Sequence, residues 1–222
     1  IVVGKYVGDN ALAAVGSASP IFNLLLVLFV GIAMGAGIMV SQYYGSRDRE
    51  NLSQTIGSTI TLTAMASVLL MIVGTLAIRP VLVLLDTPES IIDWCTSYLM
   101  ILLWGIAGLA YYNILCGILR GLGDSLSALV YLLIATVINI VLDVWFVAGF
   151  HMGVAGAAGA TVLSQAISGV LCLFYIKKKF PILRIQKREW KLRGSCIGRL
   201  CSMGIPMGLQ YSITAIGSVI LQ

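Results

Sequence analysis

Charged side chains are scarce in this sequence: Asp, Glu, Lys and Arg together make up 10% of its 222 residues. A soluble domain usually carries about a quarter charged residues. Histidine occurs once, and the five cysteines show none of the paired spacings that bind zinc, so we expect free thiols and no metal site. No motif pairs a nucleophile with a general base, which argues against an enzyme.

Hydrophobic residues make up 59% of the chain and fall into charge-poor stretches long enough to cross a bilayer. A transmembrane helix needs about 20 mostly apolar residues. The helices of a large soluble core are the alternative, but such helices keep a polar face that these stretches lack. We therefore predict an all-α fold, a polytopic membrane helix bundle. The six predicted spans are Asn10–Ser46, Asn51–Ile78, Trp94–Leu119, Ser125–Phe150, Met152–Ile176 and Leu200–Gln222.

The two ends of the chain suggest a fragment of a longer protein. The first residue is Ile1 rather than Met, and Gln222 falls inside an apolar run. The only long polar segment separates the fifth and sixth predicted spans, so we place a boundary there. The expected units are residues 1–176, a transmembrane lobe, residues 177–199, a linker, and residues 200–222, the start of a second lobe.

The basic residues are distributed unevenly between the loops. Loops alternate sides between successive spans, and all of the 14 Lys and Arg residues except Lys5 and Arg79 fall on one side. By the positive-inside rule this side faces the cytoplasm, so we predict a plasma-membrane protein whose segment 177–199 is cytoplasmic. That segment mixes cations with apolar residues, as expected either on a membrane surface or in a solvated linker. The pattern favours a lipid bilayer over nucleic acid as the partner.

An acidic residue inside a predicted span is the strongest sign of chemistry. Asp143 lies in the fourth span, where a charged side chain costs about 2.5 to 3.5 kcal/mol on insertion scales. Asn139 and Thr136 precede it by four and seven residues, so the three share one helix face. An intramembrane carboxylate can take up and release H⁺ or Na⁺, which is what a coupling site in a secondary transporter requires.

A second polar stripe, at spacings of three and four, is expected on the next span. It consists of Thr161, Ser164, Gln165 and Ser168. Asn113, near the cytoplasmic end of the third span, is a further candidate for a polar network. The alternative is that these groups only hold helices together through hydrogen bonds. That alternative fits Asp143 least well, because an amide would bond equally well without burying a charge.

Several short motifs occur in a characteristic order along the chain, each weak alone but specific together. They are Val3–Gly8, Ala11–Gly16, Val40–Asp48, Leu119–Asp124, Asn139–Asp143, Gly153–Ala158, Ala160–Thr161, Ser164–Gln165 and Gly204–Pro206. In the fourth of these, glycines allow a tight turn and Asp124 is placed to cap the next helix. With these motifs the chain resembles the multidrug and toxic compound extrusion (MATE) transporters over essentially its whole length.

This resemblance implies a transporter of twelve helices in two six-helix lobes around a central cleft, with this chain as the N-terminal lobe and the start of helix seven. It implies that Asn139, Asp143 and Thr161 join a helix-one Asp, expected just before Ile1, in a cation-sensitive network. It also implies export of small organic, often cationic, solutes by alternating access. We expect H⁺ or Na⁺ as the coupling ion, no other cofactor, and a monomer.

Other membrane functions remain as alternatives. A lipid-linked precursor flippase or polysaccharide exporter of the same superfamily would favour a cationic cavity, whereas the buried charge here is acidic. A channel should show a repeated pore-lining pattern, and a non-transporting scaffold has no need of an intramembrane carboxylate. The antiporter hypothesis therefore explains Asp143 best.

Overall fold

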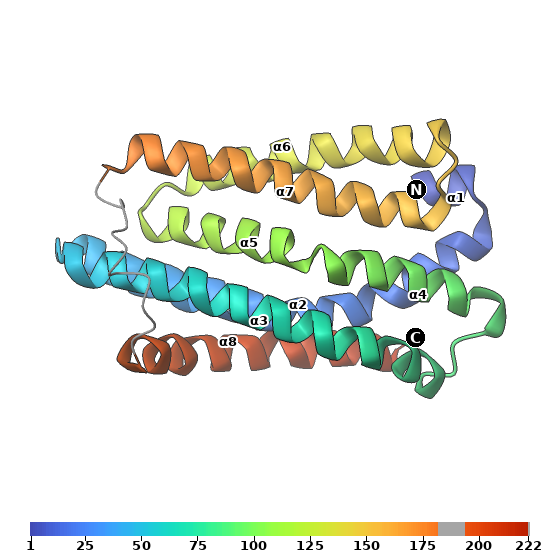
Figure 1. Cartoon of the computed structure of the whole chain (residues 1–222), viewed down its shortest axis with the longest axis horizontal. Helices are drawn as coiled ribbons and strands as arrows, with labels where there is room; N and C mark the ends of the chain where they lie inside the picture. The colour runs from blue at the N-terminus through green and yellow to red at the C-terminus, as the bar shows by residue number, and fades with distance from the viewer. Residues whose placement is uncertain (182–193, 222) are drawn as a thin grey trace.

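The computed structural model describes residues 1–181 and 194–221, which form a bundle of long helices lying side by side (Figure 1). Within these residues the structure contains helices and no strand, which confirms the predicted all-α class. The elements are α1 (Val2–Tyr6), α2 (Asp9–Gly45), α3 (Arg49–Leu84), α4 (Glu89–Trp104), α5 (Ile106–Gly121), α6 (Ser125–Asp143), the π-helix η1 (Val144–Gly149), α7 (Gly153–Lys179) and α8 (Gly194–Ile220).

Most of these helices are long and apolar enough to cross a membrane. In the described residues, α2, α3, α6 with η1, and α7 qualify individually, and the bent pair of α4 and α5 forms a fifth candidate span. These five correspond to the first five predicted spans. The sixth corresponds to α8, which is helical over 27 residues but falls outside this set. Its apolar residues are interrupted by Arg199, Gln210 and several glycines and serines, so its hydropathy is lower.

The third predicted span is broken where the sequence suggested one continuous helix. α4 and α5 meet at Gly105 with a bend of 54°. A side chain at Gly105 would overlap Val162 of α7, so the missing Cβ lets α7 lie directly against the bend. The glycine therefore serves packing as well as curvature.

Close backbone contacts hold α2 at the centre of the bundle. A Cβ built on Gly31 of α2 would lie 2.7 Å from the carbonyl oxygen of Gly204 in α8. Likewise, a Cβ on Gly117 of α5 would lie 2.7 Å from the carbonyl oxygen of Ala33. Small residues are therefore needed where α2 meets both neighbours, as in other membrane helix interfaces.

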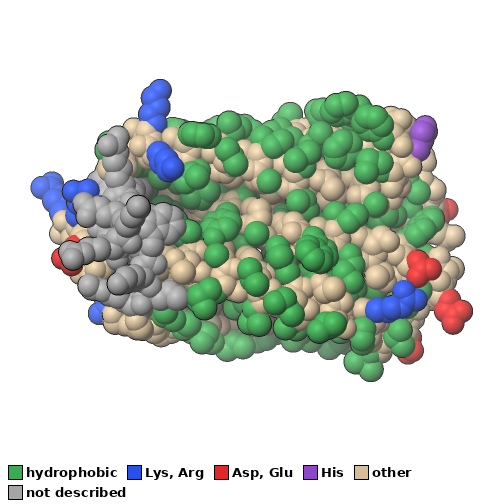
Figure 2. Space-filling model, viewed as in Figure 1, with side chains coloured by type: hydrophobic (Ala, Val, Ile, Leu, Met, Phe, Trp, Pro, Cys, Tyr) green, Lys and Arg blue, Asp and Glu red, His purple; other side chains and the backbone are tan. Residues whose placement is uncertain are grey.

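The helices reverse direction at two opposite ends of the bundle, and the charges follow this division. The turns between α2 and α3 and between α5 and α6, the end of α7 and the start of α8 lie at one end (Figure 1). Lys and Arg dominate that end, whereas Asp, Glu and the single histidine gather at the other, with apolar side chains between them (Figure 2). The alternation expected from the loop charges is thus present in the fold.

Two aspartates cap helices at the lysine- and arginine-rich end. Asp48 accepts a hydrogen bond from the backbone N–H of Asn51 (3.2 Å), and Asp124 accepts one from that of Ser127 (3.1 Å). The predicted cap at Asp124 is therefore present. Both ends of the predicted linker 177–199 are helical, because α7 continues to Lys179 and α8 begins at Gly194. The rest of that linker lies outside the described residues.

Candidate functional site

Asp143 is the last residue of α6, where the α-helix gives way to the π-helix η1. The N–H of Phe150 donates to the carbonyl of Trp145, five residues earlier (3.0 Å), as expected for this wider helix. π-Helical turns are rare and often occur at functional sites. The sequence suggested one regular helix across this region, so the change of helix type next to Asp143 is a feature that sequence reasoning missed.

The carboxylate of Asp143 is incompletely satisfied. Its Oδ1 atom is buried, and the described residues supply no hydrogen-bond donor to it. One turn earlier on the same helix, Asn139 donates from Nδ2 to the hydroxyl of Thr161 on α7 (3.3 Å). The Thr161 hydroxyl donates in turn to the carbonyl of Ala157 (3.1 Å). An unpaired buried carboxylate oxygen therefore lies beside a polar bridge between α6 and α7.

Apolar side chains pack beside this site at η1. Val147 of η1 packs with residues of α1, α2 and α7 in one buried cluster, whose members are Val3, Ala11, Val147, Val154 and Ala157. The short helix α1 contacts both η1 and α7. Because the surroundings are apolar, a charge on Asp143 is poorly solvated there, and a bound cation or proton would relieve that cost.

Two further residues of the predicted stripe on α7 accompany Thr161. Ser164 is buried and donates to the backbone carbonyl of Thr161 (2.9 Å). Gln165 is half-buried, and its buried Oε1 atom has no donor among the described residues. Gln165 thus adds a second unsatisfied oxygen to the site, this one on α7 and one turn from Thr161.

The structure does not bring the remaining predicted residues to this bridge. Thr136 is exposed, and its hydroxyl donates to the carbonyl of Leu132 in its own helix (2.8 Å). It lies two helical turns from Asp143, about 10 Å along the axis. Asn113 likewise donates to the carbonyl of Leu109 within α5 (2.8 Å). Shared periodicity placed Thr136 on the same helix face as Asp143, but the structure keeps it two turns away, so its place in a polar network stays a prediction.

A buried polar stripe on α3 went unrecognised in the sequence. Thr59, Thr63 and Ser67 are fully buried, and each hydroxyl donates to the carbonyl four residues earlier at 2.7 Å. Near the start of α3, the hydroxyls of Ser53 and Ser58 are buried and have no partner among the described residues. The spacing of four from residue 55 to residue 67 is the signal that could have revealed this stripe.

The oxygen and amide groups at the end of α6 suit a proton or a hard monovalent cation better than a transition metal. Such cations favour carboxylate, carbonyl and hydroxyl oxygens, whereas zinc favours thiolate and imidazole. The described residues contain no group of three His, Cys, Asp or Glu side chains placed to hold a metal. The geometry supplies one ionisable group, Asp143, and neutral hydrogen-bonding partners.

Comparison with known proteins connects this chain to a family. The MatE family model matches residues 1–145. The chain is 30% identical over 226 aligned residues to the "Probable multidrug resistance protein YoeA" of Bacillus subtilis, covering 99% of this chain and 49% of that protein. The chain thus spans about half the length of the curated relatives it matches.

Solved structures give the same result in three dimensions. The inward-facing conformation of a multidrug resistance MATE family transporter of the MOP superfamily superposes with a TM-score of 0.93 at 25% identity, covering 99% of this chain and 50% of that one. An outward-facing conformation of a transporter described in the same terms superposes with a TM-score of 0.88 at 26% identity, covering 95% and 47%.

Proposed function

The chain belongs to the MATE family of transporters, and from that premise we propose that it is the N-terminal lobe of an antiporter that exports small organic solutes in exchange for H⁺ or Na⁺. The single observation that carries this proposal is the buried, unpaired Oδ1 of Asp143 beside the Asn139–Thr161 hydrogen bond. A structural role alone would not require a carboxylate at this position, because an amide could bridge helices without the cost of a charge.

Coupling would follow from the two charge states of Asp143. Without a cation, the carboxylate needs water or a polar partner, which favours a hydrated and open site. Binding of H⁺ or Na⁺ removes that requirement and allows the helices around the site to close. Asn139 and Thr161 would orient the carboxylate, and η1 would accommodate the change, as the frequent occurrence of π-helical turns at functional sites suggests. The structural relatives in inward- and outward-facing conformations support alternating access as the larger movement.

The test is gradient-driven export by the full-length protein in vesicles. A fluorescent organic cation is loaded, and a pH gradient or a sodium gradient is imposed separately, so that the coupling ion is identified. We expect Asp143→Asn to insert and fold normally but to lose gradient-dependent export. Asp93→Asn is the matched control, because Asp93 is an exposed carboxylate paired with Arg79 (3.4 Å) and should leave export unchanged. Wild-type export by Asp143→Asn would contradict the coupling role.

We also propose the remaining features of the whole protein: residues 1–176 as one lobe, residues 200–222 as the start of a second, a monomer, and a plasma membrane location. The proposed orientation places the lysine- and arginine-rich end in the cytoplasm. Single cysteines at His151 and Lys178 of a cysteine-free variant test it, because they lie at opposite ends of the bundle. An impermeant thiol reagent added to intact cells should label position 151 and spare position 178, and the reverse would overturn the orientation.

A further inference from the structure

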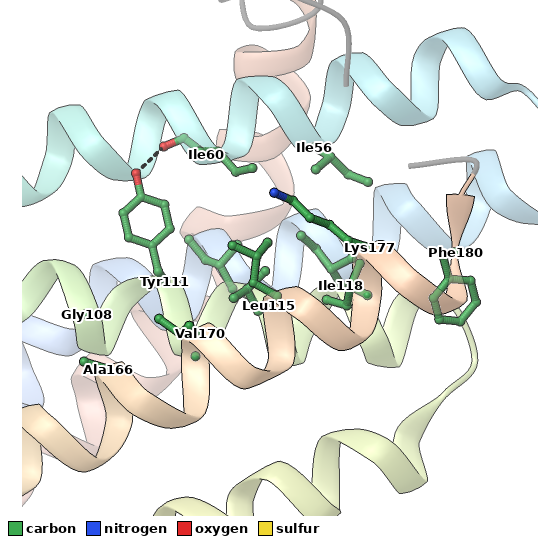
Figure 3. A pocket seen from close by; sticks show the side chains of 14 residues that line it. Ile56, Ile60, Gly108, Tyr111, Leu115, Ile118, Ala166, Val170, Lys177 and Phe180 are labelled. Atoms are coloured by element: carbon green, nitrogen blue, oxygen red, sulfur yellow. Dashed lines mark hydrogen bonds between the residues drawn. The ribbon is translucent and has the colours of Figure 1, made fainter. Parts of the chain in front are cut away.

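A deep groove lies between α3, α5 and α7 at the lysine- and arginine-rich half of the bundle, away from Asp143. Its volume is about 830 Å³. Ile56 and Ile60 of α3 form one wall, Leu115 of α5 the floor, and Val170 of α7 the other wall (Figure 3). From Ala166 to the end of α7 the groove follows the helix axis for about 16 Å or more.

The groove is almost entirely apolar and opens to the outside of the bundle. Val170 and Leu173 are exposed at its edge, whereas Leu115 is buried at its base. The hydrogen atom of the Tyr111 hydroxyl already has an acceptor within the protein, because this hydroxyl donates to the carbonyl of Ile60 (3.1 Å; Figure 3). The groove opens between α3 and α7, both long and apolar enough to cross a membrane, and its length and apolar lining match an acyl chain.

One positively charged side chain lies at the opening of the groove. Lys177 extends from α7 across the opening towards Ile56 and Ile60 (Figure 3). Its neighbour Lys179 is engaged by the Asp124 carboxylate and the Tyr175 hydroxyl (2.7 Å each). Among the ion pairs of the described residues, none includes Lys177. The ammonium group is therefore available to an anion positioned at the end of the groove.

We propose that this groove binds an anionic phospholipid of the leaflet at the lysine- and arginine-rich end, with the phosphate at Lys177 and an acyl chain along Ile56, Ile60 and Val170. Basic groups beside apolar grooves between membrane helices are suited to anionic headgroups. An organic cation would be repelled by Lys177, which separates this groove from the proposed export pathway. The inference concerns a structural lipid and does not depend on the proposed coupling at Asp143.

The experiment measures lipid contact rather than transport. In the full-length protein, the native tryptophans are replaced by phenylalanine and a single reporter is placed in the groove as Val170→Trp, with Leu173→Trp as a second reporter if the first fails to fold. The protein is reconstituted in vesicles containing phosphatidylglycerol or phosphatidylcholine with brominated chains, which quench tryptophan on contact. We expect the anionic lipid to bind about fivefold more tightly than the zwitterionic one, as one lysine near the surface predicts.

The variant Lys177→Gln should remove this preference, whereas the matched variant Lys178→Gln should keep it, because Lys178 does not line the groove. Equal quenching by both lipids in the protein with Lys177 intact would identify ordinary bulk-lipid contact and overturn the proposal. Absence of quenching by either lipid would mean that another part of the protein fills the groove, which also overturns it. These conclusions rest on the quenching measurements alone, whether or not the same variants lose export.

Discussion

Helix α6 carries an aspartate at each end, and the two carboxylates lie in opposite surroundings. Asp124, the cap at its start, accepts hydrogen bonds from the N–H of Ser127 (3.1 Å), the hydroxyl of Tyr175 (2.8 Å) and the ammonium of Lys179 (2.7 Å). Asp143, at its other end, has a buried oxygen to which the described part of the chain provides no donor. Three donors satisfy the Asp124 carboxylate, whereas Oδ1 of Asp143 can still accept a hydrogen bond or bind a cation.

This difference shows how one pair of helices can hold both a structural acid and a candidate coupling acid. The hydrogen bond from Lys179, together with those from Ser127 and Tyr175, holds the pKa of Asp124 well below its ordinary value. A carboxylate held charged at all physiological pH values cannot exchange protons. Changes near Asp143 should therefore affect transport, and changes near Asp124 should affect stability.

The largest effect is expected from crowding the Asp143 end. A Cβ at Gly156 of α7 would lie 2.8 Å from the Cβ of Met152 and 3.2 Å from that of Phe146 in η1, so Gly156→Ala must displace Met152 and crowd η1. Overpacking of this kind costs about 1 to 3 kcal/mol in the free energy of unfolding. We expect a value near the upper end, measured by thermal unfolding of the purified full-length protein, together with reduced export in vesicles.

Gly159→Ala is the matched control for this substitution, because it lies three residues further along the same helix and a Cβ there meets no atom within 4 Å. Replacing glycine by alanine in an open helical position stabilises by up to about 1 kcal/mol. Equal loss of stability in both variants would show that α7 itself, rather than its contact with η1, is sensitive to alanine.

The second effect is a loss of stability at the Asp124 end. Asp124→Ala removes the helix cap and the partner of Lys179, which should lower the free energy of unfolding by about 1 to 2 kcal/mol at neutral pH. Export per folded molecule should stay within about twofold of wild type, because Asp124 lies at the far end of α6 from the polar bridge. Unfolding curves and vesicle transport, measured on the same preparations, check both statements.

The stability difference between wild type and Asp124→Ala should depend on pH in a defined direction. The folded-state pKa of Asp124 is depressed, so its contribution is fully present above the unfolded-state pKa of about 3.9 and is lost as the pH falls through the folded-state value. Asp124→Asn keeps the capping oxygen but not the charge, so its free energy of unfolding should fall between those of wild type and Asp124→Ala. If the stability difference between wild type and Asp124→Ala increased as the pH fell, the ion-pair explanation would be contradicted.

Much of the fold follows from the sequence because hydropathy and charge report directly on the bilayer. The five spans found in the structure and the division of charge between the two ends needed only segment length and loop composition. The break at Gly105 could not be predicted in this way, because hydropathy does not reveal that Val162, from a distant part of the chain, packs against this glycine. The π-helix after Asp143 likewise packs against α1 and α7, and segment length and loop composition do not reveal such contacts.

The candidate site was only partly predictable. Polar spacing on α6 and α7 indicated the two faces that carry Asn139 and Thr161, which are hydrogen-bonded in the structure. Helical periodicity gives the direction of a side chain but not its height relative to a neighbouring helix. Thr136 was for that reason grouped with Asp143, from which the structure separates it by two helical turns, and Asn113, proposed separately, bonds to Leu109 within its own helix.

The third effect tests the polar bridge itself. Asn139→Ala removes the donor to Thr161, and a neutral hydrogen bond contributes about 1 kcal/mol, so we expect roughly a fivefold loss of gradient-driven export. Asn113→Ala removes an amide that, within the described part of the chain, donates to its own helix, and this change should leave export close to wild type. If the two substitutions reduced export equally, the bridge between α6 and α7 would have no special role in coupling.

The smallest effect is expected at Thr136, which the sequence placed on the same face as Asp143. Its exposed hydroxyl bonds back to Leu132, and threonine hydroxyls that do so contribute little to a helix, so Thr136→Val should change the free energy of unfolding by less than about 0.5 kcal/mol. Valine keeps the shape of threonine, so the substitution removes only the hydroxyl. Gradient-driven export should therefore remain within about twofold of wild type at matched expression. A loss of export comparable to that of Asn139→Ala would mean that the transport cycle brings Thr136 to the polar site in another conformation, and that the functional surface of α6 extends two turns further from η1.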